Sequence, residues 1–225
     1  MARHRLEYLE ALGVTAYEPR PAARAGKGGE CPAATDPTLM DWDGLAATVQ
    51  GCRRCELCAG RTQTVFGVGD RHARLMVVGE APGAEEDRQG EPFVGRAGRL
   101  LNAMLRAAGL SREQVYIANI LKCRPPQNRD PQPVEVAQCL PYLLRQVELV
   151  APALVLCVGR IAAQSLLATD SPLGRMRGRL HQLQSGVPVL VTYHPAYLLR
   201  APGEKRKAWE DLKRVIEVLG DGHGA

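Results

Sequence analysis

Four short apolar runs, each rich in β-branched residues, alternate along this chain with stretches of helical periodicity. The apolar runs are "RLMVVGE" (74–80), "VYIANIL" (115–121), "ALVLCVG" (153–159) and "VPVLVTYH" (187–194). Runs that are apolar almost throughout are typical of strands covered on both faces. The helical stretches are residues 95–109, 133–150, 160–168 and 204–220. Strands that alternate with helices predict an α/β protein, with a parallel sheet and helices on both of its sides.

The first part of the chain lacks this order. Residues 15–38 are rich in Pro, Ala and Gly without an apolar period, which predicts a flexible linker. Cys31 within it is expected to be a free thiol. The next stretch, "DWDGLAATVQGC", is typical of a helix, with Asp41 or Asp43 as its N-cap. We therefore expect an N-terminal extension over residues 1–44 and one domain over residues 45–220.

Charge and hydropathy exclude some classes of protein. No apolar run approaches the ~20 residues that span a bilayer, so no membrane association is expected. The N-terminus carries acidic residues and has no apolar core like that of a secretory signal, which favours a cytoplasmic location. The net charge of +5 is a mild basic bias that suits either a solvated surface or a polyanionic partner.

The chain has seven cysteines, an odd number, and several of them are clustered. A disulfide framework is not expected in a reducing cytoplasm, where clustered cysteines more often bind metal. Cys52 and Cys55 form a C-x-x-C pair, and Cys123 and Cys139 are the next pair along the chain. Four thiolates suit either a tetrahedral zinc ion or a [4Fe–4S] cluster, and the spacing alone does not choose between them.

The other cysteines of the domain have simpler interpretations. Cys58 competes with Cys55 as a ligand, since it lies in the same short segment. Cys157 falls inside an apolar run, where a buried core thiol is expected.

Polar side chains follow the predicted strands where ligands bind in parallel sheets, outside the carboxyl ends of the strands. Glu80 follows the first strand, Asn119 ends the second, and His194 ends the fourth, while Phe93 lies a short loop after the first. The Gly- and Pro-rich segment after Glu80 is neither a P-loop nor a G-x-G-x-x-G motif, which argues against a nucleotide cofactor. Taken singly, each side chain has an ordinary structural role open to it, such as a turn cap or a core ring.

Together, these side chains suit the recognition of uracil. An amide can accept the N3–H of uracil and donate to its O4, whereas cytosine presents the reverse pattern and would be rejected by Asn119. Phe93 can stack on the base, and His194 can donate to O2 as negative charge develops on the departing uracil. Glu80 can position a water molecule or stabilise positive charge on the sugar.

Several longer segments carry a resemblance to a known family. They are "CRRCELCAGRTQTVFGVGD", "MVVGEAPGAEEDRQGEPFVGRAGRLLNAML", "VYIANILKCRPPQNRDPQPVEVAQC", "LVLCVGRIAA" and "VTYHPAYLLR". In these motifs and in the spacing between them, residues 45–217 closely resemble the family 4 uracil-DNA glycosylases, the iron–sulfur branch of the uracil-DNA glycosylase superfamily. Residues 1–44 fall outside the resemblance.

The resemblance implies a cofactor and a more specific fold. It implies a [4Fe–4S] cluster bound by Cys52, Cys55, Cys123 and Cys139, disfavours zinc, and leaves Cys31, Cys58 and Cys157 without a ligand role. It also implies a three-layer α/β/α sandwich around a four-stranded parallel sheet, with the active site across the strand tips.

The resemblance further implies a role for each site residue. Glu80 and His194 would be catalytic, Phe93 would stack on the base, and Asn119 would read uracil. Glu86 would occupy the space beside C5 of uracil and exclude the methyl group of thymine. Ala81 lines the substrate site where the best-known branch of the superfamily has an aspartate, so no carboxylate activates water from that position.

Contacts with DNA are implied by the histidine loop. Leu198 in "HPAYLL" would fill the gap left by the flipped base, a wedge that offsets the cost of flipping. Basic residues near the cysteines and the histidine loop would neutralise phosphates. They are Arg53, Arg54, Arg61, Lys122, Arg124, Arg129 and Arg200.

The expected activity is therefore that of a monofunctional, monomeric DNA-repair enzyme. It would flip deoxyuridine out of DNA, hydrolyse the N-glycosidic bond and leave an abasic site. Two alternatives stay open at this point: a non-catalytic iron–sulfur module that binds nucleic acid, and a glycosylase that acts more broadly on deaminated bases.

Overall fold

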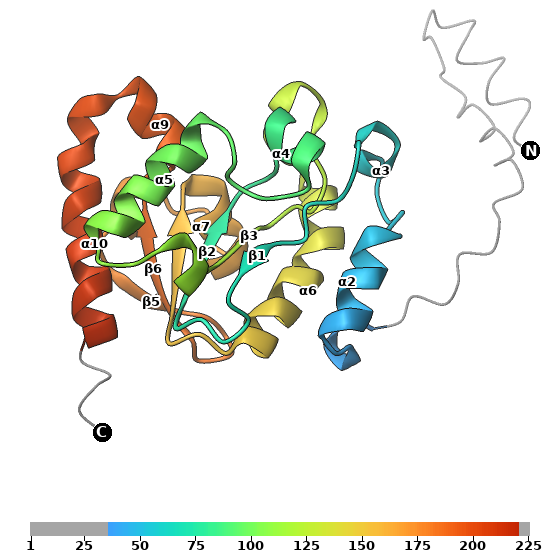
Figure 1. Cartoon of the computed structure of the whole chain (residues 1–225), viewed down its shortest axis with the longest axis horizontal. Coiled ribbons are helices and arrows are strands. Elements are labelled where there is room, and N and C mark those ends of the chain that lie inside the picture. The colour runs from blue at the N-terminus through green and yellow to red at the C-terminus, as the bar shows by residue number, and fades with distance from the viewer. Residues whose placement is uncertain (1–35, 221–225) are drawn as a thin grey trace, which may run out of the picture. The chain divides into compact units, whose positions relative to one another are not determined.

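The computed structural model describes residues 36–220, which fold around one mixed β-sheet of six strands (Figure 1). The strand order is β1-β3-β2-β4-β6-β5. The strands are β1 (Val68–Gly69), β2 (Leu75–Gly79), β3 (Tyr116–Asn119), β4 (Leu154–Val158), β5 (Leu180–Gln182) and β6 (Pro188–Thr192). The predicted α/β class is confirmed.

The number of strands differs from the expected four. β3, β2, β4 and β6 are parallel neighbours and match the four apolar runs of the sequence. Two short strands extend this sheet at its edges, because β1 pairs antiparallel with β3 and β5 pairs antiparallel with β6. Neither edge strand has the continuous apolar pattern of a buried strand, so sequence analysis missed both.

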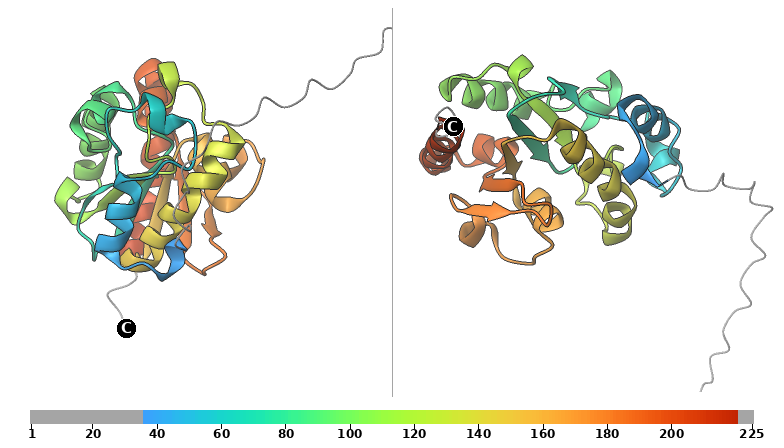
Figure 2. Two further views of the ribbon diagram at one scale, coloured as in Figure 1. Left: turned by 90° about the vertical axis from the view of Figure 1, so that its right-hand side faces the viewer. Right: turned by 90° about the horizontal axis from the view of Figure 1, so that it is seen from below.

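Helices cover both faces of the sheet, as Figure 1 and Figure 2 show. The α-helices are α2 (Trp42–Gln50), α3 (Leu57–Gly60), α4 (Ala84–Gln89), α5 (Arg96–Ala107), α6 (Pro133–Val150), α7 (Arg160–Leu167), α8 (Leu173–Met176), α9 (Pro195–Arg200) and α10 (Lys205–Gly220). The short 3₁₀ helices are η1 (Pro37–Leu39), η2 (Arg112–Gln114), η3 (Pro126–Asn128) and η4 (Pro202–Glu204). One apolar cluster joins the sheet to α2, α6 and α7, and a second joins its other face to α5, α9 and α10.

Local chemistry explains where α2 begins. Asp41 is the N-cap, and its carboxylate accepts a hydrogen bond from the Gly44 amide at 2.8 Å. The cap satisfies one of the backbone N–H groups that the first turn of a helix leaves unpaired. Leu45 and Val49, one turn apart, are then buried on the face that meets the core. Of the two caps expected from the sequence, Asp41 is the one used.

Residues 36–44, which the sequence assigned to the extension, already contact the domain. Pro37 is buried, and Arg145 Nε of α6 donates to the Met40 carbonyl at 2.7 Å. The rest of the predicted extension, residues 1–35 with Cys31 and most of the linker, lies outside the described residues. Within residues 36–220, no helix is long and apolar enough to cross a membrane.

Candidate active site

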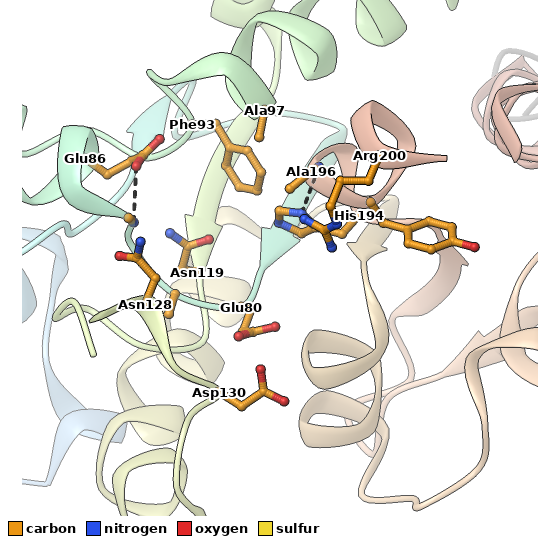
Figure 3. A pocket seen from close by; sticks show the side chains of 13 residues that line it. Glu80, Glu86, Phe93, Ala97, Asn119, Asn128, Asp130, His194, Ala196 and Arg200 are labelled. Carbon is orange, nitrogen blue, oxygen red and sulfur yellow. Dashed lines mark hydrogen bonds between the residues drawn. The ribbon is translucent and has the colours of Figure 1, made fainter. Parts of the chain in front are cut away.

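A cavity of about 450 Å³ opens at the carboxyl ends of the parallel strands (Figure 3). It is lined by Glu80, Ala81, Gly83, Glu86, Phe93, Ala97, Asn119, Asn128, Asp130, His194, Ala196, Tyr197 and Arg200. The parallel sheet brings these distant segments together, because β2, β3 and β6 all end at this edge. The predicted position of the site, across the strand tips, agrees with the location of the cavity.

Asn119 lies at the closed end of the cavity with an unpaired acceptor. It is the last residue of β3, in register with Gly79 of β2, and only 2% of its surface is exposed. Its Oδ1 atom is buried and has no hydrogen-bond partner within the described residues. Buried polar atoms are nearly always paired, so an unpaired amide oxygen at a cavity wall indicates a ligand that donates to it.

Gly79 makes room for this amide and for the aromatic ring beside it. A Cβ atom added at Gly79 would collide with Asn119 Oδ1 and with Phe93 Cζ. The glycine at the end of β2 therefore allows both side chains to approach the same wall of the cavity.

Phe93 is held in place by the Glu86 carboxylate. Glu86 Oε1 accepts from the amides of Val94 (3.0 Å) and Gly95 (3.1 Å), and its Oε2 accepts from the Gly83 amide (3.1 Å). Phe93 itself has a φ of 55°, an uncommon backbone conformation for a bulky residue. These bonds tie the two residues that follow Phe93 to the turn before α4, which supports the strained backbone from its C-terminal side.

Glu86 is also the residue predicted to exclude the methyl group of thymine. Glu86 lines the cavity, as predicted, and its oxygens are already committed to backbone donors. Its position is therefore fixed, which is what a residue that excludes a methyl group by its bulk requires.

His194 is a donor of defined orientation. It precedes α9 as its N-cap, and its Nδ1 accepts the Ala196 amide at 3.1 Å. The proton of the neutral ring then lies on Nε2, because one ring nitrogen accepts and the other donates. Burial lowers the pKa of His194 to about 4, with a smaller contribution from the positive charge of Arg200. Near neutral pH, the ring is an uncharged donor 5.7 Å from Phe93, centroid to centroid.

Glu80 has an elevated pKa. Burial is the main cause that raises the pKa of Glu80, the negative charge of Asp130 adds to the rise, and Arg160 opposes both, which together place the pKa at about 7. Figure 3 shows the carboxylates of Glu80 and Asp130 pointing toward each other. Arg160 Nη2 lies 3.2 Å from Asp130 Oδ2. A half-buried carboxylate that titrates near neutrality is typical of a catalytic group.

Five predicted substrate and catalytic residues therefore lie on one cavity together with Ala81. They are Glu80, Glu86, Phe93, Asn119 and His194. Arg200 also lines it and is exposed, which suits a DNA contact. Their individual chemical roles stay predictions.

Leu198 corrects the sequence analysis. Only 1% of its surface is exposed, and it packs in the apolar cluster between α9 and the sheet. A side chain that enters DNA has to be exposed, so Leu198 is not positioned as a wedge. Tyr197 lines the cavity instead, is 38% exposed and stacks on Tyr193 with ring centroids 5.2 Å apart.

Sequence analysis also missed Asn128 and Asp130. Both lie in the irregular segment between β3 and α6, which folds back over the cavity. Arg129 anchors that segment, since its two terminal nitrogens bind the two oxygens of buried Glu135 at 2.6 and 2.9 Å. The polar "QNRD" sequence indicates an exposed or functional loop. It does not indicate that the loop reaches this cavity.

The cysteines gather at a second, smaller cavity. It is lined by Val49, Cys52, Arg54, Cys55, Cys58, Arg61, Lys122, Cys123, Gln138 and Cys139. The four predicted ligands are therefore neighbours, and Cys58 joins them. Cys157 is fully buried in β4, as expected of a core thiol.

Several hydrogen bonds in this cavity point at sulfur. Arg61 Nη1 donates to Cys123 Sγ (3.1 Å), the Lys122 amide donates to Cys139 Sγ (3.2 Å), and Tyr142 Oη to Cys52 Sγ (3.5 Å). Burial raises the pKa of Cys123 and of Cys139, and the neighbouring Arg61 and Lys122 oppose that rise. Hydrogen bonds to sulfur are typical of iron–sulfur sites. Among the described residues, no three His, Cys, Asp or Glu side chains are arranged to hold a single metal ion. Four cysteine thiolates around one small cavity are a donor set that suits a [4Fe–4S] cluster or a zinc ion.

Two of the basic residues expected to contact phosphates are committed elsewhere. Lys122 is only 1% exposed and cannot reach a phosphate on the surface, so that expectation is wrong. Arg129 forms the bidentate pair with Glu135. In a sequence, a basic residue in a polar loop looks the same whether its charge faces water or an internal partner.

The fold and the site together define a class of protein. Residues 66–213 match the model of the uracil DNA glycosylase superfamily. The chain belongs to the uracil-DNA glycosylase superfamily.

Individual relatives refine that assignment. A type-4 uracil-DNA glycosylase of Archaeoglobus fulgidus is 43% identical over 185 residues, which cover 79% of this chain and 93% of that protein. A type-4 enzyme of Thermotoga maritima is 41% identical over 78% of this chain and 93% of its own length. A type-5 uracil-DNA glycosylase of Thermus thermophilus is 31% identical over 69% of this chain and 87% of its own length. The predicted resemblance to the type-4 branch is confirmed.

Proposed function

We propose that this protein excises uracil from DNA by hydrolysing the N-glycosidic bond, which leaves an abasic site. The observation that carries the proposal is the buried, unpaired Asn119 Oδ1 beside the Phe93 ring at the end of the cavity. The type-4 relatives, named as uracil-DNA glycosylases, support the same activity. We also expect the protein to act as a monomer, because a single chain brings Glu80, Asn119 and His194 to this cavity.

Base selection follows from the direction of the hydrogen bonds. Asn119 Oδ1 accepts the N3–H of uracil, and its Nδ2 donates to O4. Cytosine has an unprotonated N3 and an amino group at these places. Acceptor would then face acceptor at N3, and donor would face donor at the amino group. Because Asn119 Oδ1 is buried, a base that cannot donate to it leaves the desolvation cost of that oxygen uncompensated. Glu86 then excludes the methyl group of thymine by its fixed position.

Cleavage of the glycosidic bond relies on groups that stabilise the charges that develop in the transition state. His194 donates from Nε2 to O2 of uracil, where negative charge grows as the bond breaks. A neutral imidazole suits this task because it donates a hydrogen bond without having to give up a proton. Ionised Glu80 stabilises the positive charge that develops on the sugar and orients the attacking water. Ala81 offers no carboxylate, so Glu80 carries this function without help from its neighbour.

The DNA lies over the mouth of the cavity. Arg200 is exposed at the rim and pairs with the phosphate backbone. Tyr197, exposed beside it, takes the place assigned to Leu198 and stacks where the flipped nucleotide has left the duplex.

The cysteine cavity holds a [4Fe–4S] cluster through Cys52, Cys55, Cys123 and Cys139. The sulfur-directed donors of Arg61 and of the Lys122 amide support this set. When bound, the cluster supplies a cross-link between the segment around α3 and the irregular segment that follows β3. A cytoplasmic location, where cysteines stay reduced, suits such a cluster.

An alkali-cleavage assay tests the activity. The protein is incubated with a labelled duplex that contains one uracil, and alkali then breaks the strand at any abasic site. We expect cleavage at the uracil, none in a duplex with thymine there, and loss of cleavage in Asn119→Ala but not in Gln182→Ala on the remote β5. Binding without cleavage by the wild-type protein would show a non-catalytic DNA-binding module instead.

A further inference from the structure

A lysine lies buried directly beneath the uracil-reading asparagine. Lys122 is 1% exposed, and its Nζ donates to the Asn119 carbonyl at 3.0 Å and to Gln146 Oε1 at 2.6 Å. Burying an ammonium group is costly unless its hydrogen bonds are satisfied. A methionine or leucine would fill the same space without that cost. We therefore expect a function for the hydrogen bonds that only the ammonium group can donate.

Gln146 presents its oxygen to the lysine in a fixed orientation. It is fully buried in α6, and its Nε2 donates to the Phe66 carbonyl and to Tyr116 Oη, both at 3.0 Å. Because both partners of the nitrogen are acceptors in this arrangement, the amide cannot rotate without losing them. The ammonium of Lys122 is therefore held between a rigid support in α6 and the end of β3.

The Asn119 carbonyl is a position where the backbone needs such support. β3 ends at Asn119, and the chain then turns away into the irregular segment. The neighbouring amides are still paired with β2, since Ile120 donates to the Gly79 carbonyl (2.9 Å) and Leu121 to the Glu80 carbonyl (3.0 Å). The Asn119 carbonyl shares its peptide group with the Ile120 amide, so the bond from Lys122 satisfies the second polar atom of the peptide next to the side chain that reads the base.

The same residue also borders the cysteine cavity. Its backbone amide donates to Cys139 Sγ, and the residue lines that cavity beside Cys123. One residue thus contacts a proposed cluster ligand through its backbone and the base-reading residue through its side chain.

We propose that Lys122 is a positioning residue for base recognition: its buried ammonium, braced by Gln146, locks the end of β3 so that Asn119 presents its amide to uracil in one orientation. The proposal rests on the proposed function, because it concerns how that site reads its base. It assigns to Lys122 a role in uracil affinity that is separate from DNA binding.

The test compares two ligands that differ in whether a base is present. Lys122→Met keeps the length of the side chain and removes the charge. We expect inhibition by free uracil to weaken by about tenfold or more, as expected for the loss of a charged hydrogen bond. The affinity for DNA that carries a tetrahydrofuran abasic analogue should stay within about twofold, since no base is read there. Lys213→Met, an exposed lysine on α10, is the matched control and should change neither value.

Gln146→Met provides a second variant because the side-chain hydrogen bonds of Gln146 go to Lys122, Phe66 and Tyr116. It should weaken inhibition by uracil in the same direction while iron content and visible absorption stay at the wild-type level. If Lys122→Met loses its iron or does not fold, this variant decides the question.

Two results would overturn the proposal. The first is inhibition by uracil at the wild-type level in Gln146→Met and in any folded Lys122→Met protein. The second is a proportional loss of affinity for uracil and for abasic DNA, which a purely structural role would produce. Failure of the proposed function is distinguishable from both, because the wild-type protein itself would then neither excise uracil nor be inhibited by it.

Discussion

The His194 ring is fixed in one tautomer by the backbone amide of Ala196, two residues further along the chain. Because its pKa is about 4, the ring stays neutral over the range in which most proteins are stable. In the proposed mechanism, the neutral ring donates a hydrogen bond to uracil O2 and keeps its proton. At the scale of single residues, the site therefore depends on one oriented donor, His194, and one unpaired acceptor, Asn119 Oδ1.

Replacing His194 tests the donor. His194→Phe should lower the rate of the chemical step by about 10²–10³-fold, the typical loss when one donor to a developing anion is removed. Single-turnover excision kinetics measure this rate, and DNA affinity measured by anisotropy should change little. A loss of DNA binding as large as the loss of rate would instead assign His194 to binding.

The Glu80 carboxyl should govern the pH dependence of excision. Its pKa is raised to about 7, so the active carboxylate forms as the pH increases through that value, and activity should rise with it. His194 does not contribute to this limb, because its own titration lies near pH 4. The measurement is kcat/KM across pH 5–9.

Two neighbours of Glu80 should move that profile in opposite directions. Asp130→Asn removes a charge that raises the pKa of Glu80 and should shift the rise to lower pH, whereas Arg160→Gln removes the opposing charge and should shift it to higher pH. Both shifts should be modest, since Asp130 and Arg160 are largely exposed. Shifts in the same direction in the two variants would contradict this assignment.

At the scale of elements, sequence patterns predicted what is local and missed what depends on the fold. The four buried strands and the Asp41 cap of α2 follow from apolar periodicity and capping chemistry, which neighbouring residues determine. The edge strands β1 and β5 are short and partly exposed, so they have no such pattern. Lys122 and Leu198 were misplaced because a letter in a loop or a short helix does not reveal which way its side chain points.

The end of β2 should not tolerate a larger residue than glycine. Gly79→Ala adds a Cβ that collides with Asn119 Oδ1 and Phe93 Cζ, so we expect a loss of uracil excision. Gly174→Ala in α8 is the matched control, since a Cβ there meets nothing within 4 Å. Excision at the wild-type rate by Gly79→Ala would show that neither side chain needs its present position.

The two neighbouring residues of α9 should separate DNA contact from stability. Tyr197→Ala should lower excision from duplex DNA with little change in stability, because Tyr197 is exposed at the rim. Leu198→Ala should cost about 2–5 kcal/mol in the free energy of unfolding, as is usual for a buried leucine. Excision assays and chemical denaturation distinguish them. A stable Leu198→Ala protein with impaired duplex activity would restore Leu198 as the wedge.

At the scale of the whole molecule, residues of the segment that follows β3 line two cavities. Asn119 lines the larger cavity, while Cys123 in the irregular segment and Cys139 in α6 line the smaller one. The motif "NILKC" thus links base recognition to the cysteine site over a few residues. Sequence analysis grouped these residues through a family resemblance, whereas their connection through Lys122 depends on side-chain contacts that only the fold provides.

The cysteines should differ sharply in their effect on iron. Cys139→Ala should lower the iron content, bleach the brown colour of the purified protein and lower its melting temperature, because it removes a proposed cluster ligand. Cys157→Ala, in the core of β4, should retain iron, and Cys58→Ala should retain it as well. Iron analysis of anaerobically purified protein checks this set. Loss of iron in Cys58→Ala, with retention in Cys55→Ala, would exchange those two ligands.

The central claim is that Asn119 Oδ1 accepts the N3–H of a flipped uracil. A crystal structure of the protein with a uracil-containing product duplex tests it most directly. The account predicts that uracil lies on the Phe93 ring, with its N3 within hydrogen-bond distance of Asn119 Oδ1 and its O2 near His194 Nε2. A uracil bound in that cavity with N3 directed to another residue, or bound outside the cavity, would contradict it.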